Sequence, residues 1–181
     1  MVAGGCAIDL GTLGGDVSQA SDINDRGVIV GYASTDDQAV HAFRKLPGRP
    51  MTDLDQGTFA FSEALAVNRA GAAVGYGDSR AVLWDRDGTV HDLGAGHSSQ
   101  ANDINADGVV VGSGPAPGAS FRAFVWDPDE RAVELLPTAH PGGEEFQQAE
   151  GINDGARSWA PRSPPAAPPT ACCGAGPTTS P

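Results

Sequence analysis

Six consecutive residues, Asp103-Ile104-Asn105-Ala106-Asp107-Gly108, have the oxygen spacing with which a calcium-binding loop begins. Alternate side-chain oxygens suit a hard cation, and the glycine permits the sharp turn that such a loop requires. The twelfth position is Gly114, however, where a calcium loop places a bidentate glutamate. Asp103, Asn105 and Asp107 are therefore the calcium candidates, but we favour a simple turn and expect no metal and no cofactor.

The four histidines, His41, His91, His97 and His140, are the next candidates for chemistry, because histidine is the usual general base near neutral pH. His91 and His97 flank Asp92, but no serine or cysteine stands in the sequence context of a nucleophile. The glycine-rich stretches also lack the lysine of a phosphate-binding loop. We predict no catalytic residues and interpret the chain as a protein that is not an enzyme.

The calcium candidate belongs to a pattern that recurs along the chain, S-x-A-x-x-[IV]-N-x-x-G-x-x-V-G. Complete copies of the pattern occupy residues 18–31, 62–75 and 99–112, and a fourth begins at Gln147. Other copies lack the acidic residues of the candidate, so a turn explains every copy and calcium explains only one. The signature positions of the repeat are Asn24, Gly27, Gly31, Asn68, Gly71, Gly75, Asn105, Gly108, Gly112 and Asn153.

Each signature predicts a turn between two strands. The asparagine side chain can accept a hydrogen bond from the backbone two residues on, and the first glycine supplies a positive φ. The apolar residues that follow, such as Val28-Ile29-Val30, are typical of a buried strand. The second glycine permits close backbone approach or a bend. Further strands are expected near residues 39–46 and 51–54, and no segment shows a helical apolar period.

Four short strands per unit of about 40 residues is the pattern of a β-propeller blade. We therefore predict an all-β fold of propeller-like tandem repeats, incomplete at about 3.5 blades. The expected repeat domain covers residues 1–156, and a β-sandwich with quasi-repeats and a β-solenoid are the alternatives. The copies are expected near residues 7–46, 50–86 and 88–128, with a truncated fourth at 131–156.

A second landmark in each copy is His41-Ala42-Phe43, matched by residues 80–84 and 122–126. With Asp9-Leu10-Gly11-Thr12-Leu13-Gly14-Gly15 at the start, it makes residues 7–154 resemble the HAF-repeat family. Tryptophans end the two matching stretches, at Trp84 and Trp126, and we expect them to pack in the core rather than to stack on sugars. His41 is likewise expected to pack or cap between strands rather than to catalyse.

The resemblance implies architecture and an extracellular location, and it supplies no catalytic residues. It favours a non-enzymatic scaffold or binding module whose ligand is an unknown protein or glycan. The alternatives are a fragment of a propeller-type hydrolase or lyase and a non-functional product of a frameshifted gene. The hydrolase or lyase alternative requires converging acidic groups or a set of metal ligands at one mouth of the propeller, whereas the aspartates here fall mainly at recurrent turns and strand ends.

Charge and hydropathy exclude two classes of partner. Asp and Glu number 23 against 11 Lys and Arg, a formal net charge of −12, which repels phosphate backbones and argues against nucleic-acid binding. No stretch approaches the roughly 18 apolar residues of a membrane span. The first residues lack the basic and apolar regions of a signal peptide, so the extracellular expectation rests on the family resemblance alone.

The fourth copy follows the pattern as far as Asp154 and then loses it. Residues 157–181 hold half of the chain's 14 prolines, and we expect a disordered Pro/Ala-rich tail. If Ser158 has a TCN codon, reading residues 157–161 two bases later restores the expected apolar-apolar-glycine sequence. One deleted base then accounts for the tail. We hypothesise a frameshifted fragment of a longer secreted protein, prone to self-association through exposed strand edges.

Overall fold

The computed structural model describes residues 7–117, 119–136 and 147–155. These residues form β-strands and turns and no helix, which confirms the predicted all-β class. The described ranges accordingly offer no helix long and apolar enough to cross a bilayer. The tail at 157–181, with the reading frame inferred for it, lies outside the described residues.

The strands form three four-stranded antiparallel sheets, each built from consecutive strands of the chain. Sheet 1 contains β1 (Gly14–Ile23), β2 (Ile29–Thr35), β3 (Val40–Lys45) and β4 (Met51–Asp53). Sheet 2 contains β5 (Ser62–Val67), β6 (Ala73–Gly77), β7 (Arg80–Trp84) and β8 (Val90–His97). Sheet 3 contains β9 (Gln100–Ile104), β10 (Val110–Ala116), β11 (Ala119–Asp127) and β12 (Ala132–Leu135). The four strands in each sheet match the expected number of strands per unit.

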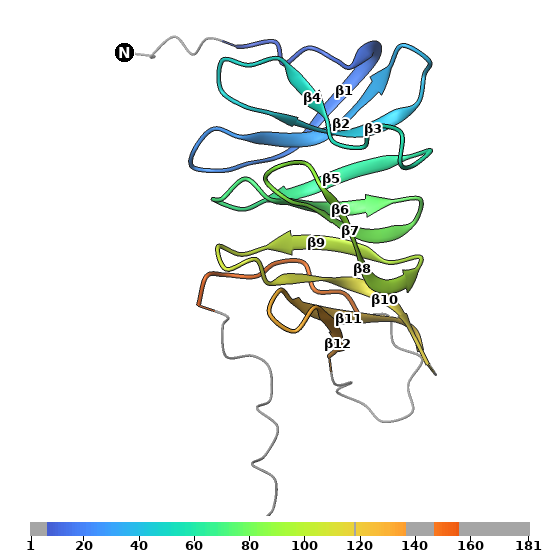
Figure 1. The fold of residues 1–181 in the computed structure, drawn as a ribbon. Coiled ribbons are helices and arrows are strands. Elements are labelled where there is room, and N and C mark those ends of the chain that lie inside the picture. Colours follow the sequence, from blue (N-terminus) through green and yellow to red (C-terminus); the bar gives the residue numbers. More distant parts are fainter. Residues whose placement is uncertain (1–6, 118, 137–146, 156–181) are drawn as a thin grey trace, which may run out of the picture.

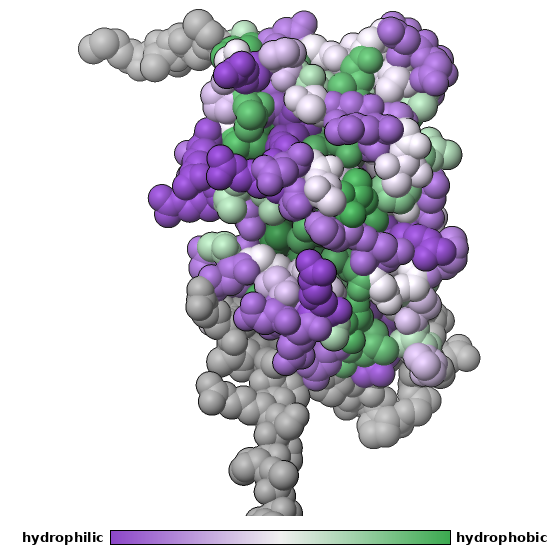
Figure 2. Space-filling view, in the orientation of Figure 1, coloured by the Kyte–Doolittle hydropathy of each residue, from purple (hydrophilic) through white to green (hydrophobic). Residues whose placement is uncertain are grey.

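The sheets stack in chain order, with sheet 2 between the other two (Figure 1). One apolar cluster joins sheets 1 and 2 and includes Val30 and Trp84, and another joins sheets 2 and 3 and includes Phe124 and Trp126. Both tryptophans are buried, which confirms that they pack in the core. Hydrophilic residues cover most of the visible face, and apolar residues show in a band that runs down through the stack (Figure 2).

The turn between the first two strands of each sheet has the predicted conformation. In sheet 1 the Asn24 amide donates to the Val28 carbonyl at 3.1 Å, and the Gly27 amide donates to the Asn24 carbonyl at 2.9 Å. Gly27 has a φ of 72°, and its equivalents Gly71 and Gly108 have φ values of 94° and 87°. Only glycine adopts this left-handed region without strain, so the first signature glycine is explained.

The second signature glycine allows two strands to approach closely. A Cβ atom on Gly31, Gly75 or Gly112 would lie 1.9, 2.0 or 2.1 Å from a carbonyl oxygen of the preceding strand. Each of these glycines stands beside a register shift in the pairing of the first two strands. The predicted close backbone approach is therefore confirmed, and it recurs at the same place in all three sheets.

Residues 147–155 lie against sheet 3, where the fourth copy begins (Figure 1). The Gln147 amide donates to the Phe121 carbonyl at 3.1 Å, and the Ala149 amide lies 3.4 Å from the Gly112 carbonyl. In the same way β9 follows sheet 2, with the Ser99 amide donating to the Ser79 carbonyl at 3.1 Å. The segment thus occupies the place on sheet 3 that the first strand of a further sheet would take.

Candidate functional site

In the calcium candidate, the side-chain oxygens of Asp103 and Asn105 accept hydrogen bonds from backbone amides. One carboxylate oxygen of Asp103 accepts a hydrogen bond from the Ile152 amide at 2.8 Å. The Asn105 side-chain oxygen accepts from the amides of Asp107 at 3.1 Å and Val109 at 2.9 Å. Within the described ranges, no three His, Cys, Asp or Glu side chains are grouped so that they could hold a metal ion. The geometry is that of a turn that contacts the next copy.

The signature asparagines connect the copies to one another. Each side-chain oxygen accepts backbone hydrogen bonds within its own turn, as the sequence predicted. The side-chain nitrogens of the first three asparagines each lie toward the backbone carbonyl of the next signature asparagine. The distances are 2.8 Å from Asn24 to Asn68, 3.1 Å from Asn68 to Asn105 and 3.4 Å from Asn105 to Asn153. The signature positions therefore have a structural role, which is to align consecutive turns.

His41 lies between two carboxylates at the boundary of sheets 1 and 2. Its Nδ1 is 2.8 Å from Asp53, its Nε2 is 3.7 Å from Asp55, and its side chain is 11% exposed. The hydroxyl of Ser62 donates to Asp55 at 2.9 Å and accepts from the Ala42 amide at 2.9 Å. Ser62 is fully buried and bonds to the aspartate rather than to the histidine. This cluster joins the two sheets and does not have the geometry of a hydrolase triad.

The serine of this cluster has a counterpart in the next copy. Ser99 is buried, and its hydroxyl accepts a hydrogen bond from the Ala81 amide at 2.9 Å. Arg80 stands there in place of His41 and contacts Asp92 and His97 instead, at 3.3 and 2.8 Å. The serine link between sheets thus recurs without the histidine. This recurrence supports a structural role, and not a catalytic one, for both Ser62 and Ser99.

The remaining histidines are dispersed. His91 lies 3.3 Å from the Asp85 carboxylate, and His97 contacts Arg80 on the surface. Asp92, which the two histidines flank in sequence, pairs with Arg80 rather than with either ring. His140 lies outside the described residues.

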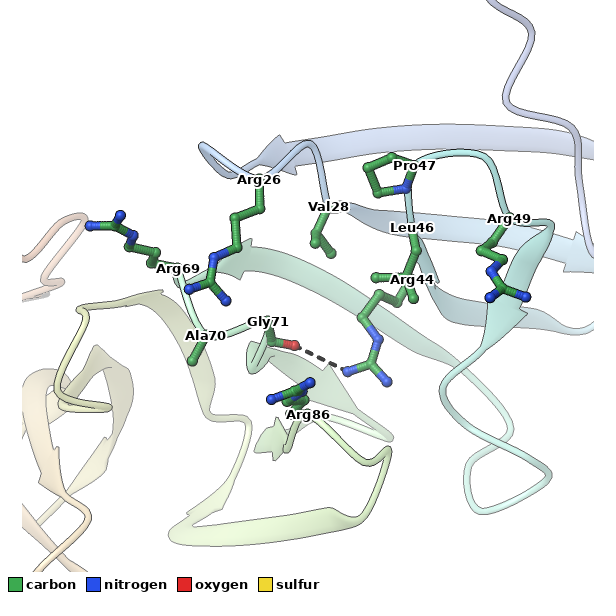
Figure 3. Close-up of a pocket in the computed structure, with 10 residues that line it drawn as sticks. All are labelled: Arg26, Val28, Arg44, Leu46, Pro47, Arg49, Arg69, Ala70, Gly71 and Arg86. Carbon is green, nitrogen blue, oxygen red and sulfur yellow. Dashed lines mark hydrogen bonds between the residues drawn. The ribbon is translucent and has the colours of Figure 1, made fainter.

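One hollow of about 360 Å³ between sheets 1 and 2 has a lining that the sequence reasoning missed. Five of its ten lining residues are arginines, in a chain with 11 basic residues and a net charge of −12. No acidic residue is among the ten. The arginines are Arg26, Arg44, Arg49, Arg69 and Arg86. Figure 3 shows Arg26, Arg44 and Arg86 extending into the space between the sheets, with Arg69 and Arg49 toward its two ends.

Arg44 is the anchored member of this arginine hollow. Its guanidinium donates to the Gly71 carbonyl at 3.1 Å and to the Asp85 carbonyl at 3.0 Å, which ties β3 to two turns of sheet 2. Burial lowers the pKa of Arg44, opposed by the charges of Asp85 and Asp87 and assisted by that of Arg86. The side chain still carries its charge at any physiological pH, because an arginine pKa starts above 12.

The other four guanidinium groups are exposed to solvent and have no anionic partner. In the part of the chain that the structure describes, Arg26, Arg49, Arg69 and Arg86 make no side-chain hydrogen bond or ion pair to a protein group. Like charges gathered at one place repel, and nothing in this lining compensates them. The hollow is therefore a site of concentrated positive charge on an acidic molecule.

Aligning the copies shows that these arginines are departures from the repeat. Arg44 occupies the position held by Leu83 in copy two and Val125 in copy three. The corresponding hollow between sheets 2 and 3 is lined by Leu83, Trp126 and one arginine, Arg131, among others. The sequence signal for the hollow therefore lies in the differences between copies and not in the shared pattern.

Comparison with protein-family models, with curated proteins and with solved structures finds no match to this chain.

Proposed function

We propose that the chain is a non-enzymatic repeat scaffold that binds its ligand at the arginine hollow between copies one and two. The observation that carries this proposal is that four exposed guanidinium groups around one hollow have no described protein partner. Elsewhere, Asp103 and Asn105 accept hydrogen bonds from backbone amides, and the described histidines contact charged side chains of the protein. The arginines gather at one boundary between stacked sheets, which we call the seam between copies one and two. Copies that are otherwise alike, with one distinctive seam, suit a binding module.

The proposal includes the architecture and location that the HAF-repeat resemblance implies. We regard the three sheets as blades of a β-propeller in an extracellular protein. Their face-to-face packing in chain order supports this, as do four antiparallel strands per copy and contacts between the first strand of each sheet and the sheet before it.

The outer face of sheet 1 supports a further part of the proposal, which is contact with another repeat. Ile23 and Val17 on β1 are 60% and 53% exposed, whereas Val67 and Ile104, which match Ile23 in the repeat, are buried against a neighbouring sheet. An apolar surface of this kind favours association with an equivalent surface. Sedimentation velocity over a tenfold concentration range tests this, since a single concentration-independent monomer would contradict it.

The experiment that tests the binding function is a screen of the purified chain against arrayed glycans and peptides, repeated with Arg26→Gln and Arg86→Gln. We expect a ligand that the native chain retains, that both variants lose, and that mass spectrometry recovers unchanged. No retained ligand, or retention equal in the variants, would refute a binding role for the hollow. A ligand recovered as cleavage products would instead favour the hydrolase or lyase alternative.

A further inference from the structure

We propose that the arginine hollow recognises a compact multivalent oxyanion, with phosphate or carboxylate groups, presented either free or on a small acidic saccharide. This inference rests on the proposed binding function and specifies its ligand class. Two sheets contribute to the site: Arg26 comes from the first turn of sheet 1 and Arg86 from the last turn of sheet 2. The site therefore exists only where copies one and two are stacked.

The chemistry of the lining selects an oxyanion. Guanidinium groups present forked donors that match the two oxygens of a carboxylate or phosphate, and they are more weakly hydrated than an ammonium group. The hollow has arginine where its counterpart between sheets 2 and 3 has mostly apolar residues. An anion held between Arg26 and Arg86 meets two guanidinium groups that have no described ion-pair partner, so binding reduces the repulsion among the arginines of the lining.

Arg44 contributes through its position. Its two hydrogen bonds to the carbonyls of Gly71 and Asp85 fix the guanidinium at the seam before any ligand arrives. A guanidinium has five N–H donors, and the two bonds to carbonyls use one nitrogen, Nη1, so donors remain for a ligand. A fixed charge loses less conformational entropy on binding than a mobile one.

The net charge of the chain limits how large the ligand can be. A volume of about 360 Å³ is at the lower end of the range for small-molecule sites. A long polyanion would extend beyond the hollow and meet a molecule whose formal net charge is −12. A compact anion remains within the positive region, so we exclude nucleic acids and long sulfated chains as the preferred ligands.

Isothermal titration of the full chain with pyrophosphate, citrate, a trigalacturonate and a neutral trisaccharide tests the inference. We expect the three anions to bind and the neutral sugar not to bind, with affinity that falls as sodium chloride is raised. Tighter binding of pyrophosphate or citrate would identify a free anion as the ligand, and tighter binding of trigalacturonate would identify an acidic saccharide. Arg26→Gln and Arg86→Gln should each weaken binding roughly tenfold, because each removes a charge-assisted hydrogen bond.

Arg131→Gln is the matched control, since it removes an exposed arginine from the other seam and should leave binding unchanged. Equal weakening in all three variants would show a diffuse charge effect and overturn the inference. Stronger binding of a long heparin chain than of every compact anion would also overturn it. If the compact anions fail while the glycan and peptide screen finds a neutral ligand at the hollow, the ligand class is wrong and the binding function stands. If both fail, the function itself is wrong.

Discussion

The side-chain nitrogen of Asn24 donates a 2.8 Å hydrogen bond to the backbone carbonyl of Asn68, the equivalent asparagine of the next copy. Asn68 repeats the relationship with Asn105 at 3.1 Å. The side-chain oxygen of Asn68 meanwhile accepts from the amides of Gly71 and Ala72 in its own turn. One residue type thus closes a turn and sets the position of the following copy, which explains why the signature contains asparagine rather than aspartate or serine.

Replacing Asn68 by alanine should therefore destabilise the fold by about 1–3 kcal/mol, because it removes the acceptor of the Ala72 amide and one of the two donors to the Asn105 carbonyl. Asn68→Asp keeps the acceptor for the turn but faces a carboxylate toward the Asn105 carbonyl, so it isolates the bond between copies. Urea unfolding followed by tryptophan fluorescence measures both changes. Asp25→Ala, an exposed change in the turn of copy one, is the control and should stay within about 0.5 kcal/mol of the native chain. An equally stable Asn68→Ala chain would contradict the structural role.

Ser62→Ala should cost about 2–3 kcal/mol, since it removes the donor to the buried Asp55 carboxylate and the acceptor of the Ala42 amide. The matched control is Ser18→Ala. Ser18 holds the same position in copy one but is exposed, and no sheet of the described chain precedes it. Thermal unfolding of both variants should separate them clearly. Similar losses at the two serines would mean that the link between sheets 1 and 2 is unimportant.

Ending the chain after residue 146 should destabilise sheet 3 by about 2–4 kcal/mol. The removed segment accepts a 2.8 Å hydrogen bond from Asn102 at the Ala149 carbonyl, donates to Asp103 from Ile152, and lines a hollow with Val109 and Val111. Ending the chain after residue 155 is the control, because it keeps every one of these contacts. Urea unfolding that is unchanged by the shorter truncation would show that the fourth copy adds nothing to the stack.

Tyr76 gives the fold a pH dependence on the alkaline side. Burial, with the 2.8 Å hydrogen bond to the Glu63 carboxylate and its charge, raises the pKa of Tyr76 to about 12. The unfolded chain releases this proton near pH 10, so the contribution to stability is complete below pH 10 and is lost as the pH rises through 12. Because the side chain is only partly buried, solvent screens the interaction and we expect at most about 1 kcal/mol.

Absorbance at the tyrosinate band tests the assignment, since the chain has only two tyrosines. Tyr76→Phe should remove the titration step near pH 12 and flatten the stability profile between pH 10 and 12. Tyr32→Phe should leave that step in place. If the titration step near pH 12 remains in Tyr76→Phe, or disappears in Tyr32→Phe, the assignment of that step to Tyr76 is wrong.

The sequence predicted the fold of one repeat because its signals are local. A glycine three residues after an asparagine determines a turn through its own φ angle, and Gly27, Gly71 and Gly108 need no distant partner to do so. The close approach at Gly75 was also predictable, since only the missing side chain permits it. Four strands per unit followed from the order of these landmarks.

The contacts between copies were not predictable in the same way. No local rule pairs the Asn24 side chain with a carbonyl 44 residues later, or brings Arg86 beside Arg44. The calcium candidate shows the limit of local patterns, because spacing alone cannot show that an oxygen of Asp103 accepts a hydrogen bond from the amide of Ile152. Departures from the repeat, such as Arg44 against Leu83, were visible in the sequence, but their meaning depended on knowing which positions meet at a seam.

The most direct test of the account is a nuclear magnetic resonance titration that follows the side-chain Nε–H signals of the arginines as pyrophosphate is added. We predict saturable shifts for Arg26, Arg44 and Arg86, smaller shifts for Arg49 and Arg69 toward the ends of the hollow, and none for Arg131 in the other seam. Shifts spread evenly over all the arginines, or absent from these five, would contradict the claim that the seam between copies one and two is the binding site.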